Sequence, residues 1–336
     1  MKKFIALLLI AVMVLAMVAC TPAQEQGGET PTYAIVCKDA SNPYMKRMVS
    51  GFKTACEALG VNFVEKSPET TSAQDQITIV NELVAQGVKA IAIAANDSAA
   101  LEATLKTARE AGIAIVTLDS DTKGSEMFIN QAGVKEVAQV LVDSVYDMAG
   151  GEGEFAVLSA SSTATNQNAW IAAMEEILKD EKYASLKLVE TVYGDDESQK
   201  STDEMQNLMT KYPNLECVCC PTTVGILAAA QVVANTADCG IKIAGLGLPS
   251  EMKDYVGGEK ACPYMYLWNP IDVGNCAAYM IKAIADGKVG EAGTEFTADN
   301  GKTYAVTAGD PAEIQIIVGP PFAFNGENIA EWASVY

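Results

Sequence analysis

FAVLSASSTATNQNAW, residues 155–170, is the stretch from which the fold can be predicted. Its first four residues are apolar and typical of a buried strand, and an amphipathic segment begins near its end. The small hydroxyl residues and amides between them therefore lie where a strand gives way to a helix. In open α/β sheets, ligands bind at this position, outside the carboxyl ends of the strands.

Uncharged polar side chains dominate the end of this stretch. Asn166, Gln167 and Asn168 offer hydrogen-bond donors and acceptors, and Trp170 offers a flat apolar face. These groups suit a polyhydroxylated small molecule better than a phosphate or a metal. The alternative is an ordinary helix start with Thr163 or Thr165 as the N-cap, and the stretch alone does not decide between the two interpretations.

On both sides of this stretch, short β-rich runs alternate with helical periods. The pattern predicts strands at 33–37, 61–64, 90–94, 113–118, 127–130, 155–158, 188–191, 216–220 and 242–245. It predicts helices at 43–59, 72–86, 98–111, 134–148, 167–179, 198–211, 224–234 and 273–285, and two last strands at 303–306 and 313–317. Strands separated by helices imply parallel sheets with right-handed crossovers. The alternation begins afresh after residue 148, so we predict an α/β fold with two doubly wound parallel-sheet lobes.

The first 32 residues have the pattern of an export segment. Met1-Lys2-Lys3 is basic, residues 4–19 are apolar, and small residues precede Cys20. We interpret residues 1–19 as a lipoprotein signal peptide, Cys20 as the lipidated residue and residues 20–32 as a flexible tether. An uncleaved membrane anchor is the alternative. Both place the folded part outside the cytoplasm, and the first attaches it to the cell membrane only through lipid.

The charge of the chain is strongly negative. It has 23 basic and 43 acidic residues, a formal net charge of −20, and loss of Lys2 and Lys3 with the signal peptide makes this −22. Such acidity argues against binding to nucleic acid or to an anionic membrane surface. Nearly half of the residues are hydrophobic, which is enough for two cores.

Eight cysteines follow Cys20, and we predict free, buried thiols for them. Their positions on predicted strands and helix faces favour burial over disulfide pairing. Cys217 and Cys220 form a C-x-x-C pair, but no second pair follows at metal spacing and the chain has no histidine. We therefore predict no metal site and no cofactor.

Seven short motifs at predicted strand ends resemble a known family. They are SNPY (41–44), DSDTK (119–123), NQAG (130–133), TNQNAW (165–170), YGDD (193–196), PTT (221–223) and LWNP (267–270). The motifs and their order are similar to those of periplasmic sugar-binding proteins of ABC transporters, of the ribose-binding type. Within this family the chain most resembles the branch of rhamnose-binding proteins and the autoinducer-2 receptor, over nearly all of residues 33–336.

The resemblance implies a fold and a function. The fold is the type 1 periplasmic binding protein fold, in which a multi-strand hinge joins two lobes. The implied first lobe comprises residues 33–131 and 270–302, and the second comprises residues 132–269 and 303–336. The implied function is passive capture of a small sugar by a monomer, which a permease in the membrane then recognises.

The resemblance also implies ligand contacts. Lys38 matches a lysine that reaches the ligand, and Asp119 matches a carboxylate at the end of the fourth strand, with Asp121 a second candidate. Gln167 and the backbone near Pro221 match contacts from the second lobe.

Two positions depart from the autoinducer-2 receptor, which has aspartate where this chain has Asn166 and alanine where it has Thr223. An amide divides its capacity between donating and accepting, so the departure favours a sugar such as rhamnose over autoinducer-2.

A sugar site needs polar groups around a rim and apolar walls. The candidate residues are Lys38, Asn42, Tyr44, Asp119, Asp121, Asn166, Gln167, Trp170, Pro221, Thr223, Trp268 and Asn269. Tyr44, Trp170 and Trp268 would form the walls. Two alternatives stay open: Lys38 and Asp119 as a plain ion pair, and the two tryptophans as ordinary core.

Other functions find little support in the sequence. Asp195 and Asp196 could suggest a glycosidase pair, but a solvated turn explains adjacent acids more simply. There is no G-x-S-x-G and no P-loop motif, and GGEG at 150–153 precedes its strand, unlike a dinucleotide fingerprint. A repressor of the same fold would need a DNA-binding segment where the export segment stands. We therefore predict a binding protein and not an enzyme.

Overall fold

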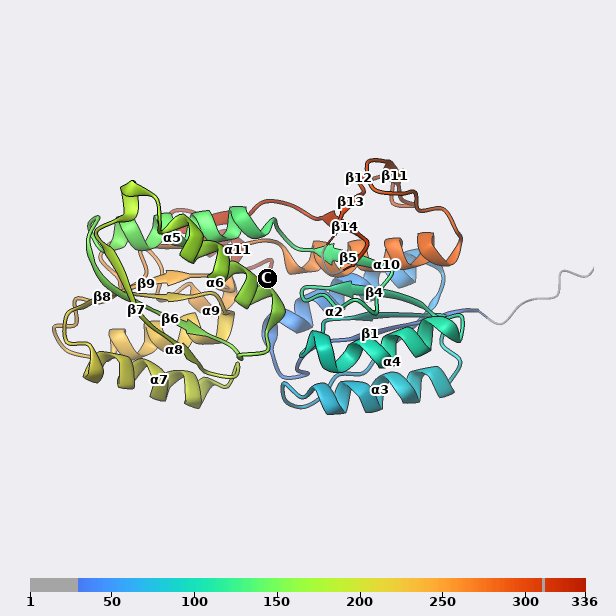
Figure 1. Ribbon diagram of the computed structural model, residues 1–336, viewed down its shortest axis with the longest axis horizontal. Coiled ribbons are helices and arrows are strands. Elements are labelled where there is room, and N and C mark those ends of the chain that lie inside the picture. The colour runs from blue at the N-terminus through green and yellow to red at the C-terminus, as the bar shows by residue number, and fades with distance from the viewer. Residues whose placement is uncertain (1–29, 310–311) are drawn as a thin grey trace, which may run out of the picture. The chain divides into compact units, whose positions relative to one another are not determined.

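Two parallel β-sheets with helices packed beside them make up the fold (Figure 1). The computed structural model describes residues 30–309 and 312–336. The predicted signal peptide, Cys20 and residues 21–29 of the predicted tether lie outside the described residues. Residues 32–336 pack together as one unit.

The first lobe is built on a seven-stranded sheet with the order β13-β14-β5-β4-β3-β1-β2. All of its strand pairs are parallel except β13 with β14. Its first elements are β1 (Thr32–Val36), α2 (Pro43–Leu59), β2 (Asn62–Glu65), α3 (Ala73–Ala85), β3 (Ala90–Ile93), α4 (Ser98–Glu110), β4 (Ala114–Leu118) and β5 (Met127–Asn130).

Helices cover both faces of this sheet. Along β1, Tyr33 and Ile35 belong to the core on the side of α2, whereas Ala34 and Val36 belong to the core on the side of α3 and α4. Because both faces are buried, these strands read as continuous apolar runs instead of alternating ones. This explains why the sequence pattern predicted them.

The second lobe is built on a four-stranded parallel sheet with the order β7-β6-β8-β9. Its elements are α5 (Val134–Met148), β6 (Gly153–Ser159), α6 (Thr165–Ile177), the 3-10 turn η1 (Glu181–Tyr183), β7 (Leu186–Tyr193), α7 (Ser198–Lys211), β8 (Leu215–Cys220), α8 (Thr223–Ala234), β9 (Lys242–Gly245) and α9 (Pro249–Met252). The predicted fold class, with two doubly wound parallel sheets, is confirmed.

A two-stranded antiparallel pair extends the second lobe. It joins β10 (Tyr264–Leu267) to β15 (Phe322–Asn325), and a bridge from Tyr266 to Leu246 connects β10 with the end of β9. The short helix α11 (Ile329–Trp332) follows β15. The sequence pattern did not predict β10, β15 or the two short helices.

Between β10 and β15 the chain returns to the first lobe. Helix α10 (Pro270–Ala285) packs against α2 at very close range, because a Cβ atom on Gly274 would lie 1.8 Å from the Met48 carbonyl oxygen. Gly51 on α2 meets α10 in the same way, with 2.0 Å to the Ile271 carbonyl oxygen. Glycine at both positions therefore lets the two helix backbones touch.

The strands after α10 differ from the predicted lobe boundary. β11 (Glu295–Thr297) and β12 (Thr303–Ala305) form a hairpin, and β13 (Thr307–Ala308) and β14 (Ile314–Ile317) join the first sheet, where β14 pairs with β5. Assigning all of residues 303–336 to the second lobe was therefore wrong for β12, β13 and β14. Strand spacing cannot reveal this pairing, which joins residues about 190 positions apart.

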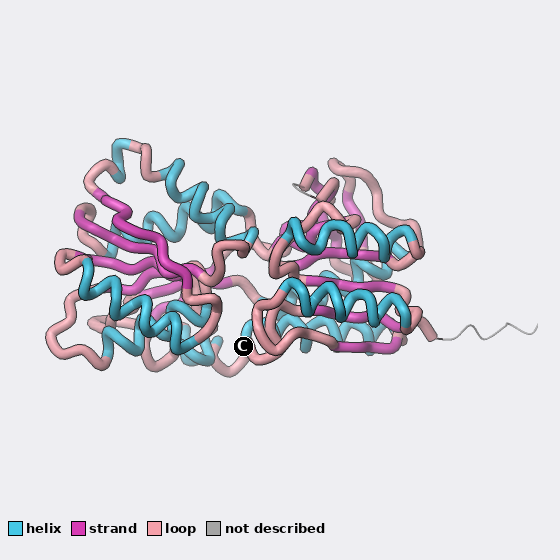
Figure 2. Tube along the Cα trace, turned by 60° about the horizontal axis from the view of Figure 1, so that its bottom comes forward, coloured by secondary structure: helices cyan, strands magenta, loops and turns pink. Residues whose placement is uncertain are grey.

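Within the described residues the chain passes between the lobes three times, after β5, after β10 and after β14. Figure 2 shows the two groups of strands and the loops between them. Loop residues at such connections can absorb the backbone changes of a hinge motion that closes two domains on each other.

The described cysteines carry free thiols. Seven of the eight are buried, as predicted, but Cys239 is only partly buried. Burial raises the pKa of the Cys217 and Cys262 thiols to about 12, so they remain protonated and unreactive. In residues 30–309 and 312–336, none of the helices has the length and hydropathy needed to cross a membrane.

Candidate ligand-binding site

A small cavity opens where the carboxyl ends of strands from both sheets meet. Its lining residues are Lys38, Asn42, Tyr44, Met45, Asp119, Asn166, Gln167, Trp170, Asp196, Pro221, Thr222, Thr223, Leu246, Leu267 and Trp268. Ten of the twelve predicted site residues are among them.

The first lobe contributes a buried ion pair. Lys38 follows β1 and Asp119 follows β4, and Lys38 Nζ lies 2.6 Å from Asp119 Oδ2. Asp119 has a φ of 62°, a left-handed backbone conformation that is rare and strained for residues other than glycine. Strain of this kind is tolerated where a side chain must be aimed at a functional site.

A chain of hydrogen bonds supports Asp119 from the aromatic side. Trp268 Nε1 donates to the Tyr44 hydroxyl at 2.7 Å, and this hydroxyl donates to Asp119 Oδ1 at 3.3 Å. Burial, together with the charge of Asp119, raises the pKa of Tyr44, which therefore stays a neutral donor. Asp119 thus meets donors on both of its oxygens before any ligand is considered.

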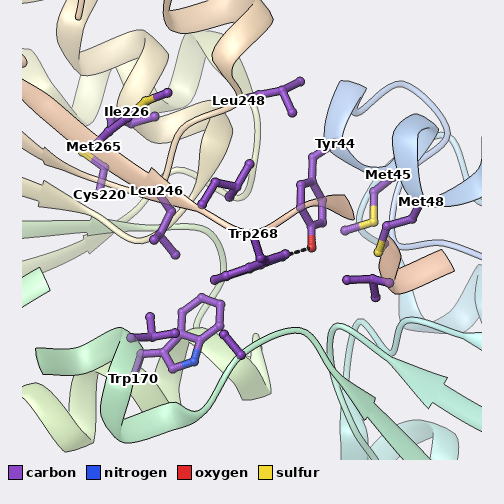
Figure 3. Close-up of a cluster of buried hydrophobic side chains, with 14 of the residues drawn as sticks. Tyr44, Met45, Met48, Trp170, Cys220, Ile226, Leu246, Leu248, Met265 and Trp268 are labelled. Atoms are coloured by element: carbon purple, nitrogen blue, oxygen red, sulfur yellow. Dashed lines mark hydrogen bonds between the residues drawn. The ribbon is translucent and has the colours of Figure 1, made fainter. Parts of the chain in front are cut away.

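Two indole rings form an apolar wall. The rings of Trp170 and Trp268 have centroids 5.6 Å apart, and the ring of Tyr44 meets Trp268 edge to face at 6.4 Å. Figure 3 shows Trp268 between Tyr44 and Trp170, with Leu246 nearby. Such rings suit the C–H face of a sugar.

The amides of the second lobe complete the rim. Asn166 meets the ion pair across the gap between the lobes, accepting from Lys38 Nζ at 3.4 Å and donating to Asp119 Oδ2 at 3.3 Å. Gln167 Oε1 accepts from Ser159 Oγ at 2.6 Å and from the Ala160 amide at 2.8 Å. These two bonds fix the side chain and leave Nε2 as a donor for the cavity.

Sequence reasoning missed one charged lining residue, Asp196. We interpreted it with Asp195 as a solvated turn, yet its carboxylate lines the cavity and accepts a hydrogen bond from the Thr222 hydroxyl. Burial raises the pKa of Asp196, while the Thr222 bond and the charge of Lys38 act in the opposite direction. The available signal was its place directly after β7, whose carboxyl end points to the same edge as that of β6.

Two predicted site residues do not line the cavity. Asp121 accepts hydrogen bonds from the hydroxyls of Thr117 and Ser125 and from the amides of Thr122 and Ala312. Burial raises its pKa, and these bonds oppose the shift. Because every oxygen is engaged inside the first lobe, Asp121 fastens the returning segment near residue 312, and its predicted place at the ligand was wrong.

The other is Asn269. It is the N-cap of α10, where its Oδ1 accepts from the Ile271 amide at 3.0 Å. This bond holds the Asn269 side chain at the start of its helix, and the residue is not part of the cavity lining. The N-cap alternative for the TNQNAW stretch was also wrong, because Ala164 occupies the N-cap of α6 and neither Thr163 nor Thr165 caps it.

The two open alternatives are not exclusive. Lys38 and Asp119 do form an ion pair, and Trp170 and Trp268 are buried core residues with 3% and 4% of their surface exposed. All four also line the cavity. They therefore stabilise the fold and shape the site at the same time.

Two doubly wound lobes that enclose a polar cavity with aromatic walls define the class of two-lobed solute-binding proteins. The chain belongs to the periplasmic binding protein domain family, whose model matches residues 33–289. This family is one of periplasmic proteins, which agrees with the predicted extracytoplasmic location.

Three similar proteins are described with the small molecules that they bind, D-allose, L-rhamnose and AI-2. The D-allose-binding periplasmic protein of Escherichia coli (strain K12) is 28% identical over 272 residues, 76% of this chain and 86% of the relative. A solute-binding protein of an ABC transporter from Clostridium phytofermentas, solved with bound L-rhamnose, is 47% identical with a TM-score of 0.88, covering 92% of this chain and 99% of that one.

The third is LsrB from Clostridium saccharobutylicum, solved in complex with AI-2. It is 21% identical with a TM-score of 0.83, covering 89% of this chain and 99% of that one, and at this identity the likeness extends to the fold alone. The predicted family is thereby confirmed. The chain is a solute-binding protein of the sugar ABC transporter type and not an enzyme.

Proposed function

We propose that the chain binds a neutral deoxyhexose of the L-rhamnose type in the cavity between its lobes. The observation that carries this proposal is the lining itself, which combines two indole rings with carboxylate, ammonium and amide groups. The relative solved with L-rhamnose supports the same ligand class through 47% identity over nearly the whole chain. A methyl group at one corner of the sugar would meet the apolar part of the lining, which includes Met45, Leu246 and Leu267.

Delivery of the sugar follows from closure of the lobes. A closed, loaded monomer presents a different surface from an open one, and a membrane permease of an ABC transporter recognises that difference. Lipid on Cys20 keeps the protein at the outer face of the cell membrane, and the residues between Cys20 and β1 give it room to reach the permease. No chemical change of the sugar is involved.

Titration calorimetry of the purified protein tests this function. The panel contains L-rhamnose, L-fucose, L-mannose, D-allose, D-ribose and autoinducer-2, with recovery of the sugar checked by NMR. We expect the tightest one-site binding for L-rhamnose, unchanged sugar, and about 2.7 kcal/mol of stabilisation at a ligand concentration of 100 Kd. Binding of autoinducer-2 alone would establish the alternative receptor function, and a new product would establish an enzyme.

Autoinducer-2 selectivity has its own variant. Asn166→Asp adds a carboxylate acceptor beside Lys38, which lies 3.4 Å from Asn166 Oδ1. If the side chain at this position selects between the two ligands, the variant gains affinity for autoinducer-2 and loses affinity for L-rhamnose. Equal changes for both ligands would contradict that role.

A further inference from the structure

Asp196 occupies the boundary between the ligand cavity and a second, larger groove. Only Asn42 and Asp196 line both spaces within the described residues. The groove is acidic, with Asp39, Glu69 and Glu197 among its lining residues. Asp196 therefore lies on the side of the cavity that is next to this acidic groove.

The hydrogen bonding of Asp196 is incomplete, in contrast to that of Asp119. The Thr222 hydroxyl donates to Asp196 Oδ1, and in residues 30–309 and 312–336 no hydrogen bond or ion pair reaches Oδ2. Asp119 instead receives Lys38 and Asn166 on one oxygen and Tyr44 on the other. A hydroxyl group in the cavity therefore finds an open acceptor on Asp196 and a largely occupied one on Asp119.

The backbone that carries Asp196 is strained and held in place. Asp195 and Asp196 have φ values of 53° and 55°, and two successive left-handed residues other than glycine are rare. The amides of Gly194 and Asp195 donate to the carbonyls of Ser159 and Ala160 at 2.9 and 2.7 Å. An ion pair from Lys200 to the Asp195 carboxylate adds a further restraint.

The strained backbone directs the Asp196 carboxylate toward the cavity. If the turn had no need of a carboxylate, glycine or asparagine would adopt these backbone conformations with less strain. Gly194 is itself required by packing, since a Cβ atom there would lie 2.2 Å from Ser201 Oγ. Surroundings that force a rare conformation on an aspartate at the rim of a cavity indicate a functional side chain.

We propose that Asp196 Oδ2 accepts a hydrogen bond from a hydroxyl group of the bound sugar. The inference rests on the proposed function and adds a specificity-determining residue to it. The second lobe then contributes a carboxylate of its own, and Thr222 orients it through the other oxygen. A hydroxyl that donates to a carboxylate forms a charge-assisted bond, which discriminates strongly against an analogue without that hydroxyl.

The test compares Asp196→Asn with Asp39→Asn, a control that lines the groove but not the cavity. L-rhamnose and its monodeoxy analogues are the probes, and calorimetry measures Kd. We expect Asp196→Asn to weaken L-rhamnose binding about 10- to 100-fold. Asp39→Asn should change it less than threefold. For one monodeoxy analogue, the wild type and Asp196→Asn should have the same Kd, because that analogue lacks the hydroxyl group that donates a hydrogen bond to Asp196.

Asp196→Gly protects the test against misfolding. Glycine adopts a φ of 55° without strain, so this variant removes the carboxylate and keeps the turn. It should weaken L-rhamnose binding at least as much as Asp196→Asn does. The inference would be overturned if both variants bound L-rhamnose as tightly as the wild type does. It would also be overturned if the variants lost the same affinity for every monodeoxy analogue. Failure of the wild type to bind any sugar would instead overturn the proposed function.

Discussion

The two lobes each aim an aspartate at the cavity from a left-handed turn, but they treat it differently. Asp119 follows β4 with a φ of 62°, and Asp195 and Asp196 follow β7 with φ values of 53° and 55°. The first turn is closed by its own lobe, where Lys38 pairs with Asp119 and both side chains are at most 7% exposed. The second is anchored from outside by Lys200, which is 41% exposed, as is its partner Asp195.

This difference separates two roles for a lysine beside an aspartate. The Lys38 pair lies in a low-dielectric interior, where each charge depends on the other. The Lys200 pair lies at the surface, where water replaces either partner at little cost. We infer that the first lobe supplies a preformed charged platform, whereas the ion pair that restrains the turn of the second lobe lies at the surface.

The largest expected effect comes from breaking the buried pair. Lys38→Met leaves the Asp119 carboxylate without its cation, and removing one partner of a buried pair costs about 3–5 kcal/mol of unfolding free energy. Lys200→Met is the matched control, with an expected cost of at most about 1 kcal/mol for a surface pair. Urea denaturation measures both.

A second variant checks the cause. Adding Asp119→Asn to Lys38→Met removes the uncompensated charge, so the double variant should recover part of the lost stability. Equal destabilisation by Lys38→Met and Lys200→Met would contradict the difference between the two lobes.

Local sequence patterns predicted the regular elements well, because their causes are local. The predicted strand at 127–130 coincides with β5, and the predicted helix at 43–59 coincides with α2, which begins at Pro43 and ends at Leu59. Asn42 caps α2 and Gly60 takes the left-handed conformation that ends it. Such signals lie within a few residues of the element that they bound.

Local sequence patterns did not predict the long-range strand pairing or the directions of the side chains. The partner of β14 is β5, far away in the sequence, so the sequence pattern could not assign β13 and β14 to the first lobe. Asp119 and Asp121 are two residues apart and chemically identical, yet one lines the cavity and the other faces the core. Only the backbone conformation at the end of β4 decides which is which. Asp196 was missed for the same reason.

A medium effect should separate these two aspartates. Asp121→Asn replaces one carboxylate oxygen by a donor, so an existing donor such as the Ala312 amide, now 2.8 Å from Oδ2, loses its acceptor. A buried donor without a partner costs about 1–3 kcal/mol. We expect lower stability in urea and less than a twofold change in the Kd for L-rhamnose.

Asp119→Asn provides the contrast, because its side chain lines the cavity. It should weaken L-rhamnose binding clearly more than Asp121→Asn does. If Asp121→Asn lost affinity as strongly as Asp119→Asn, Asp121 would contact the ligand after all, and the distinction drawn from the cavity lining would be wrong.

The smallest expected effect concerns a contact between the lobes themselves. Thr71 precedes α3 in the first lobe, and its hydroxyl donates to the Asp195 carbonyl in the second lobe at 3.3 Å. Opening the lobes breaks this bond, so it stabilises only the closed form. A neutral hydrogen bond contributes about 0.5–1.5 kcal/mol, and Thr71→Val should therefore release L-rhamnose about two- to tenfold faster. Thr70→Val is the control, since Thr70 is exposed beside it. Stopped-flow fluorescence of Trp170 and Trp268 would measure the rates of L-rhamnose release. Equal release rates for Thr71→Val and Thr70→Val would mean that the Asp195 turn responds to the sugar alone and not to closure of the lobes.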